Sequence, residues 1–239
     1  MTVTAPEKHT CALCGKKSPQ EVIYSTNTFG RPDLDLRPSE MMRSTMSTWV
    51  LRCPHCGYCA PSIEEAVEGA AQLVKGDRYR KLRNKRSYPI LARDFLCWSL
   101  LAENAGKDLD AAWAALYAAW VLDDHENARG AAECRGRAAD LFLQARKKRR
   151  NPCRRTGESE LLITDVLRRC GRFDEARELC EKALLRVPAG MMEKVLLFEW
   201  KLIRNRDTER HTVDEALSCW RKPPSPAREG TPGDDGGVS

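Results

Sequence analysis

The sequence predicts a mainly α-helical protein with a small N-terminal module of short β-strands. Three observations support this fold class: two CxxCG units near the start, two later windows with matching helical patterns, and a composition of 42% hydrophobic and 31% charged residues. Such a composition is typical of a globular chain with a packed core. We expect an N-terminal module over 1–61, a helical repeat-like domain over 62–221 and a disordered tail over 222–239, which is rich in Pro, Gly and Ser.

Four cysteines in the two CxxCG units form the clearest chemical motif. Cys11 and Cys14 lie in the first unit, and Cys53 and Cys56 lie in the second. A glycine follows each unit, where a left-handed backbone closes a tight turn. Four thiolates can complete a tetrahedral zinc site that has no open position. The sequence therefore predicts a zinc-ribbon-like module with Zn²⁺ as cofactor and these four cysteines as metal ligands.

Other interpretations of the cysteine units are a redox pair or a different ligand set. Redox-active CxxC pairs open a helix after a strand, whereas glycine and basic or aromatic residues follow here, which favours metal binding. His55 could replace one cysteine, but we expect it to point outward. Cys59 and, less readily, His9 are further alternatives, and we expect Cys59 to be a buried free thiol. Residues 22–29 and 47–52 are predicted to be the short strands that bring the two units together.

The segment between the cysteine units alternates acidic and apolar residues. Asp33, Asp35 and Arg37 fall on one face of an extended chain. Together they could bind a cation or a polar ligand, or serve as an enzyme site. The alternative, which we favour, is that they pair with one another and with Arg31 or Arg43 to fix a loop. Nothing else in the segment is typical of a nucleophile or a general base.

Taken in order, the motifs CxxCG, FGxxDLDLRP, MxRSTM and WVxxCPxCGYCA resemble an uncharacterised bacterial family, domain of unknown function family 2225. The resemblance is close over 11–61 and loose over the helical part. It implies a cytoplasmic bacterial protein with a metal site at the four cysteines and helices similar to tetratricopeptide repeats. It implies no established activity, so no catalytic residue is predicted from it.

The remaining helices follow from capping and repeat patterns. Ser62 and Glu65 form a capping box, which predicts a helix from 62 to about 75. The windows 95–118 and 160–188 match the tetratricopeptide pattern of large residues on one helix, a turn glycine and small residues on the next. One long helix is predicted over 124–146, a capping helix over 191–204 and a short helix over 212–220. Stacked repeats would offer a concave surface to a partner protein; a compact bundle that shelters the zinc ribbon is the alternative.

Two clusters inside the helical region have both a structural and a functional interpretation. The aromatic residues at helical spacing are expected to pack in the core rather than to stack on a ligand; they are Trp98, Trp113, Tyr117 and Trp120. The polar group at a helix junction is expected to cap the next helix rather than to bind a metal; it comprises Asp123, Asp124, His125 and Glu126.

Basic residues are concentrated in two runs. Seven basic residues and one acid, Asp77, lie within 75–86, and a denser run extends over 146–155. Either run could contact nucleic-acid phosphates. For 146–155 we favour a solvated helix end, because cations there complement the helix dipole and no aromatic residue is present for base stacking.

These observations lead to one functional prediction and two alternatives. The N-terminus has no secretory signal, and the longest uncharged apolar run, 111–122, is shorter than the roughly 20 residues that span a bilayer. We expect a cytoplasmic, non-enzymatic zinc-binding protein that uses a tetratricopeptide-like scaffold to bind another protein, without a membrane partner. The alternatives are a nucleic-acid-binding protein that uses the ribbon and the basic runs, and an enzyme with Asp33, Asp35 and Arg37 at its site. The sequence contains no Gly-rich phosphate loop, GxSxG or HExxH motif.

Overall fold

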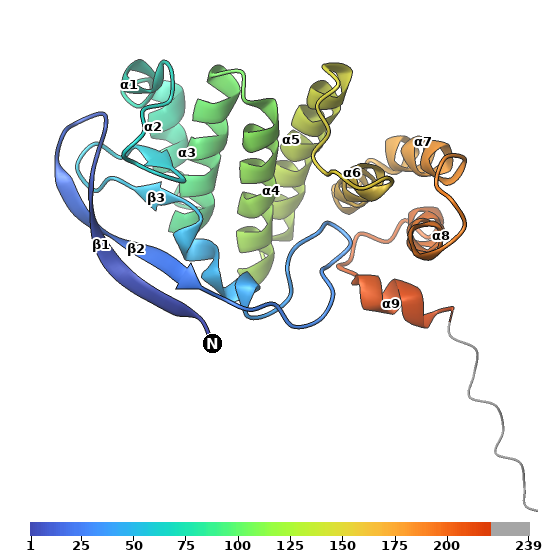
Figure 1. Cartoon of the computed structure of the whole chain (residues 1–239). Helices are drawn as coiled ribbons and strands as arrows, with labels where there is room; N and C mark the ends of the chain where they lie inside the picture. Colours follow the sequence, from blue (N-terminus) through green and yellow to red (C-terminus); the bar gives the residue numbers. More distant parts are fainter. Residues whose placement is uncertain (221–239) are drawn as a thin grey trace, which may run out of the picture.

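A computed structural model describes residues 1–220 of the chain. Over this range the protein is mainly α-helical, with a small β-structure at its N-terminus, as the sequence predicts (Figure 1). The predicted tail over 222–239 lies outside the described residues. Within the described residues no helix is both long enough and apolar enough to cross a membrane.

The N-terminal module consists of two antiparallel hairpins joined by a long segment. Strands β1 (Val3–Thr10) and β2 (Lys17–Ser25) form the first hairpin, and the two-residue strands β3 (Leu51–Arg52) and β4 (Cys59–Ala60) form the second. A 3₁₀ helix, η1 (Met42–Thr48), lies between the hairpins. Each hairpin therefore closes on one CxxCG unit.

The two predicted strands of this module are only partly correct. The strand predicted over 22–29 ends at Ser25, and most of the strand predicted over 47–52 is replaced by η1 and a bend. Hydroxyl groups account for the second error, because Thr45 and Thr48 donate hydrogen bonds to the carbonyls three residues earlier, each at 2.8 Å. Such side-chain bonds stabilise a tight turn that competes with an extended strand.

Nine helices follow within the described residues. Their bounds are α1 (Ala70–Leu73), α2 (Asp77–Arg83), α3 (Ile90–Asn104), α4 (Asp108–Asp124), α5 (Ala128–Lys147), α6 (Glu158–Arg169), α7 (Phe173–Leu184), α8 (Met191–Arg204) and α9 (Val213–Ser218). Both windows with the repeat pattern form helix pairs, α3 with α4 and α6 with α7. Gly106 and Gly171 adopt the left-handed backbone in the two connecting turns, which is the conformation that glycine permits without strain.

The helix predicted from Ser62 is wrong. Residues 62–69 form turns, and α1 begins only at Ala70. Tertiary contacts hold the two residues that follow Ser62 outside a helix. The Glu64 carboxylate accepts a hydrogen bond from the Thr10 amide at 3.0 Å, and the Ile63 carbonyl accepts one from the Ala12 amide at 2.8 Å. Residues 62–69 are therefore held as a loop against the first cysteine unit.

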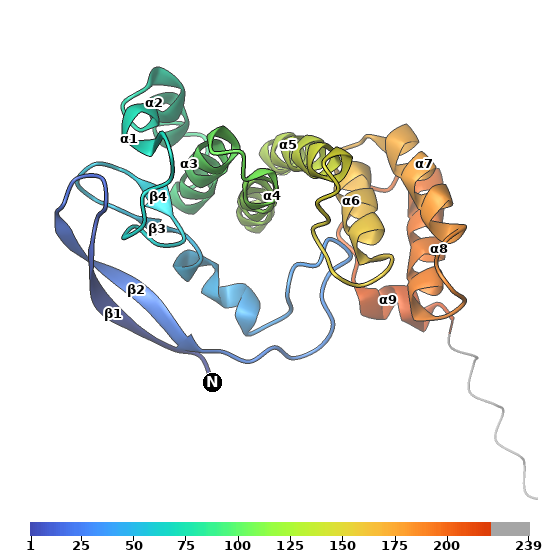
Figure 2. The same cartoon turned by 45° about the horizontal axis from the view of Figure 1, so that its top comes forward.

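The segment between β2 and η1 crosses one side of the helical array and reaches α9 (Figure 2). Backbone hydrogen bonds join it to the start of α9: the Leu34 amide donates to the His211 carbonyl at 3.0 Å, and the Val213 amide donates to the Pro32 carbonyl at 3.1 Å. We call this contact between 32–34 and 211–213 the terminal clasp. It places the DLDLRP motif against the helices rather than in an open loop.

Aromatic side chains anchor the end of this segment on α4. The Trp49 ring lies 5.1 Å from the ring centroid of Tyr117 and 6.5 Å from that of Trp120, both in edge-on geometry. Tyr117 also contacts Trp98 and Trp113. The prediction that the aromatic residues at helical spacing pack in the core is thus confirmed, and Trp49 joins them from the N-terminal module.

Candidate metal centre

The first cysteine unit forms the turn of the β1–β2 hairpin. Thr10 and Lys17 are the last paired residues of the two strands. Beyond them, the Cys11 amide donates to the Lys16 carbonyl at 3.0 Å, and the Gly15 amide donates to the Cys11 carbonyl at 2.8 Å. Gly15 has a φ of +68°, so the chain can reverse directly after Cys14. The turn therefore directs both thiols of the unit to one side.

The second unit repeats the same local geometry on the β3–β4 hairpin. The Cys53 amide donates to the Tyr58 carbonyl at 2.9 Å, and the Gly57 amide donates to the Cys53 carbonyl at 2.9 Å. Gly57 has a φ of +79°. Two CxxCG sequences thus produce two equivalent knuckles, which face each other although Cys14 and Cys53 are 39 positions apart in the chain.

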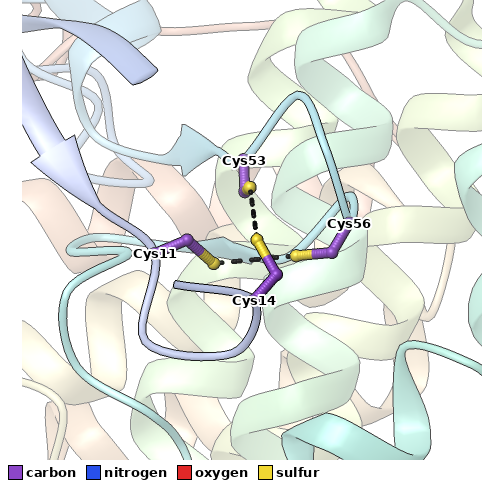
Figure 3. A group of neighbouring side chains, drawn as sticks. All are labelled: Cys11, Cys14, Cys53 and Cys56. Carbon is purple, nitrogen blue, oxygen red and sulfur yellow. Dashed lines mark hydrogen bonds between the residues drawn. The ribbon is translucent and has the colours of Figure 1, made fainter. Parts of the chain in front are cut away.

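The four sulfur atoms converge on one point (Figure 3). Cys11 Sγ lies 3.6 Å from Cys56 Sγ, and Cys14 Sγ lies 3.6 Å from Cys53 Sγ. All four lie within 4.8 Å of one another. Four sulfurs at about 2.3 Å from a tetrahedral zinc ion would be roughly 3.8 Å apart. The spacing therefore fits a single metal ion, and the cluster could hold one.

The thiols are separate groups rather than disulfides. All eleven cysteines are free, and a 3.6 Å separation is far longer than the roughly 2.05 Å of a disulfide bond. Burial raises the pKa of the Cys53 thiol, but hydrogen bonds from the backbone amides of Cys56 and His55 outweigh burial and lower that pKa to about 7. The backbone of the second knuckle thus stabilises a thiolate at Cys53, whereas burial raises the pKa of the Cys56 thiol in the same knuckle.

The alternative ligands lie away from the cluster, which among residues 1–220 contains the four cysteines and no other candidate ligand. His55 is exposed, as predicted. His9 lies 3.2 Å from the Glu64 carboxylate. Cys59 is buried, and its Sγ lies 3.4 Å from the Gly57 carbonyl and 3.7 Å from the Asp94 carboxylate. This agrees with its predicted role as a buried thiol.

One residue of the metal centre's surroundings was not predicted from the sequence. The Arg83 guanidinium of α2 covers the second knuckle and donates to the Cys56 carbonyl at 3.3 Å. Gly57 leaves room for it, since a Cβ at this position would overlap the guanidinium. The only available signal was the basic run that contains Arg83, and that run does not specify a partner. Helix α2 thus supports the metal centre from outside.

The charged residues of the DLDLRP motif all have oppositely charged partners elsewhere in the chain. Asp33 accepts from Arg43 at 2.7 Å and from Arg210 at 3.3 Å. The Arg37 guanidinium, which is 3% exposed, pairs with Asp124. These contacts favour the interpretation that the motif fixes a loop over the interpretation that it forms an enzyme site. The pair with Arg37 also occupies the carboxylate of Asp124, which belongs to the polar cluster over 123–126.

Asp35 has the most extensive set of partners. It is fully buried, and it accepts hydrogen bonds from Trp120 at 2.7 Å, from Arg169 at 3.0 Å and from Arg135 at 3.3 Å. Burial raises the pKa of this carboxyl group, but the two arginines and the Trp120 hydrogen bond outweigh burial and lower it below its ordinary value. Neither Arg135 nor Arg169 was predicted as a partner, because the sequence carries no signal that links them to Asp35.

Comparisons with protein-family models, curated proteins and solved structures find no match to this chain. The resemblance to domain of unknown function family 2225 therefore stays a prediction from the sequence motifs. The site is defined by its own geometry: a four-cysteine cluster at the tips of two hairpins, packed against a helical body.

Proposed function

We propose that the protein is a non-enzymatic zinc-binding protein in which a structural metal centre fixes the N-terminal module to a helical scaffold that binds another protein. The observation that carries the proposal is the convergence of four sulfurs with the spacing of a tetrahedral site. Four thiolates leave zinc no open position, so the ion would stabilise the fold rather than activate a substrate.

The β1–β2 hairpin has almost no hydrophobic core, which supports a structural role for the metal. Strand β1 contains no buried residue, and β2 buries only Ser18 and Gln20. Hairpins with so little buried apolar surface need another source of stability. A four-cysteine zinc site supplies folding free energy directly, because the unfolded chain has no preformed site.

The metal assignment is tested by elemental analysis of the purified protein. We expect about one equivalent of zinc per chain and four thiols protected from alkylation until a chelator is added. Cys53→Ser should lose most of the bound metal, whereas Cys219→Ser, which alters an exposed cysteine outside the cluster, should retain it. Less than about half an equivalent of zinc with all thiols reactive would contradict the proposal, and iron instead of zinc would correct the metal identity.

The scaffold part of the proposal is supported by the paired helices and by the resemblance of both windows to tetratricopeptide repeats. The test is a pull-down at moderate salt with nuclease present, followed by a titration with the purified candidate partner. We expect a defined protein partner whose binding survives both treatments. A candidate that does not bind directly in the titration would argue against an adaptor role.

A further inference from the structure

Helix α2 carries the most concentrated positive charge next to the metal centre. Between 75 and 86 the chain has seven basic residues and one acid. The cations are distributed around the helix rather than along one stripe. At 100° per residue, Arg80 and Arg83 fall on one face of α2, and Arg78 and Lys81 fall on the opposite face. The helix is therefore positively charged on both sides.

A groove lies along each of these faces. The first has a volume of about 610 Å³ and lies between the cysteine knuckles and α1–α2, where Lys75, Arg80 and Arg83 line it together with His55. The second has a volume of about 280 Å³ and is lined by Arg78, Lys81, Lys85 and Arg137. No carboxylate belongs to the lining of either groove. The charged side chains that line the two grooves are therefore all basic, although Arg137 and Lys85 of the second groove pair with Glu103 at 2.7 Å and with Glu133 at 3.6 Å.

The second basic run differs in how its charges are used. Lys148 pairs with the buried carboxylate of Asp108 at 2.7 Å, and Arg146 pairs with Glu160 at 3.0 Å. These bonds hold the end of α5 to neighbouring helices. On α2 the ion pairs are longer: Arg80 lies 3.6 Å from Asp77 and Arg78 lies 3.7 Å from Glu103.

Two α2-side cations have no such partner at all. Among the residues that the structure describes, Lys75 and Lys81 lie within 4.0 Å of no carboxylate. Both side chains are exposed. They can neutralise an external anion without first losing an internal ion pair. The same is true of Lys147, Arg149 and Arg154 in the second basic run, so it is the two grooves that distinguish α2.

We infer that α2 and its two grooves bind the phosphate backbone of a nucleic acid. The phosphates of a nucleic acid repeat along the strand, so they can contact cations on both faces of a helix. A ligand with a single carboxylate would instead need cations gathered around one pocket. Neither groove has an aromatic lining residue on which a base could stack. Binding should therefore depend on phosphate contacts and be largely independent of base sequence. This inference goes beyond the proposed function and does not depend on which metal the cysteines hold.

The test compares two triple variants of the full chain that remove the same charge. Lys75→Ala/Arg80→Ala/Lys81→Ala removes three exposed cations in and beside α2, and the control Lys147→Ala/Arg149→Ala/Arg154→Ala removes three exposed cations of the other basic run. Neither variant alters a cysteine. Binding of a labelled mixed-sequence single strand of about 20 nucleotides is followed by fluorescence anisotropy between about 50 and 200 mM salt. Far-UV circular dichroism checks that both variants keep the fold.

For the α2 variant we expect at least about tenfold weaker binding at the lowest salt. The slope of log K against log salt should become shallower by about two, since each lost phosphate contact contributes roughly 0.7 for a single strand. The control variant should bind within about twofold of the unaltered chain. Equal weakening in both variants, or no binding of the unaltered chain at about 50 mM salt, would overturn the inference. Competition by polyglutamate as effective as that by nucleic acid would also overturn it, in favour of an acidic peptide ligand.

Discussion

At the scale of single residues, Asp35 shows how the N-terminal segment is attached to the helical body. Its carboxylate has no contact with water and joins Trp120 of α4, Arg135 of α5 and Arg169 of α6. Removal of one partner from a buried ion pair leaves an uncompensated charge, which costs about 3–5 kcal/mol. One side chain therefore couples three helices to a segment that lies far away in sequence.

Asp35→Asn should lower the free energy of unfolding by about 3–5 kcal/mol, measured by urea denaturation with the metal bound. The matched control is Asp140→Asn, which breaks a surface pair with Arg172 and should cost no more than about 1 kcal/mol. An effect of Asp35→Asn as small as that of the control would show that the buried pairs contribute little net stability.

The same carboxyl group predicts a pH dependence. Its pKa is lower in the folded protein than in the unfolded chain, where it is about 3.9. Its contribution is therefore complete at neutral pH and decreases as the pH falls below about 4, because the unfolded chain then takes up a proton that the folded protein does not. The stability difference between the unaltered chain and Asp35→Asn should narrow over that range. A difference that is constant down to about pH 2 would contradict this assignment.

At the scale of elements, the two cysteine knuckles have the same backbone but different surroundings. A Cβ on Gly15 would meet no atom within 4 Å, whereas one on Gly57 would overlap the Arg83 guanidinium and lie 3.1 Å from its Cδ. Both glycines have positive φ values. The knuckles should therefore tolerate alanine to different degrees, and the difference should depend on Arg83.

Gly15→Ala should cost about 1–2 kcal/mol through backbone strain alone, and Gly57→Ala should cost roughly 1 kcal/mol more because Arg83 must move and lose its bond to Cys56. In an Arg83→Ala background the extra cost should disappear. The coupling is measured by urea denaturation of the unaltered chain, Gly57→Ala, Arg83→Ala and the variant with both substitutions, which together form a double-mutant cycle. Equal costs for both glycines, with no coupling to Arg83, would refute it.

Local patterns in the sequence predicted some elements well and failed at others for a physical reason. The knuckle turns and the α6–α7 turn at Gly171 depend on a few neighbouring residues, so their motifs sufficed. The capping box at Ser62 did not start a helix because Ile63 and Glu64, which follow it, accept hydrogen bonds from Ala12 in the first knuckle and from Thr10 beside it. The partners of Asp35 were missed because they lie 100 and 134 residues further along the chain, and no local pattern encodes a contact at that distance.

At the scale of the whole molecule, the metal centre and the helical body differ in what stabilises them. Helices α4 and α5 bury many apolar side chains, whereas the β1–β2 hairpin buries almost none. Loss of a structural metal should therefore affect the N-terminal hairpins first.

Chelation of the metal should increase hydrogen exchange at the Gly15 and Gly57 amides, which close the two knuckle turns, by at least about tenfold. The amides in the centres of α4 and α5 should keep their protection. Exchange resolved by mass spectrometry or NMR, with and without chelator, measures both. Unchanged exchange at the knuckles in a chain shown to have lost its metal would mean that the metal does not stabilise them.

The terminal clasp also has a consequence for how the chain is made. Asp33 and its partner Arg210 are 177 residues apart, so a ribosome that adds roughly 5–20 residues per second needs about 10–35 s between them. For most of that interval both cysteine knuckles have been synthesised, and Asp35 gains its partners in α4, α5 and α6 one after another, while residues 32–34 still lack 211–213. The four cysteines can therefore meet early in synthesis, whereas the terminal clasp closes only after residues 211–213 emerge.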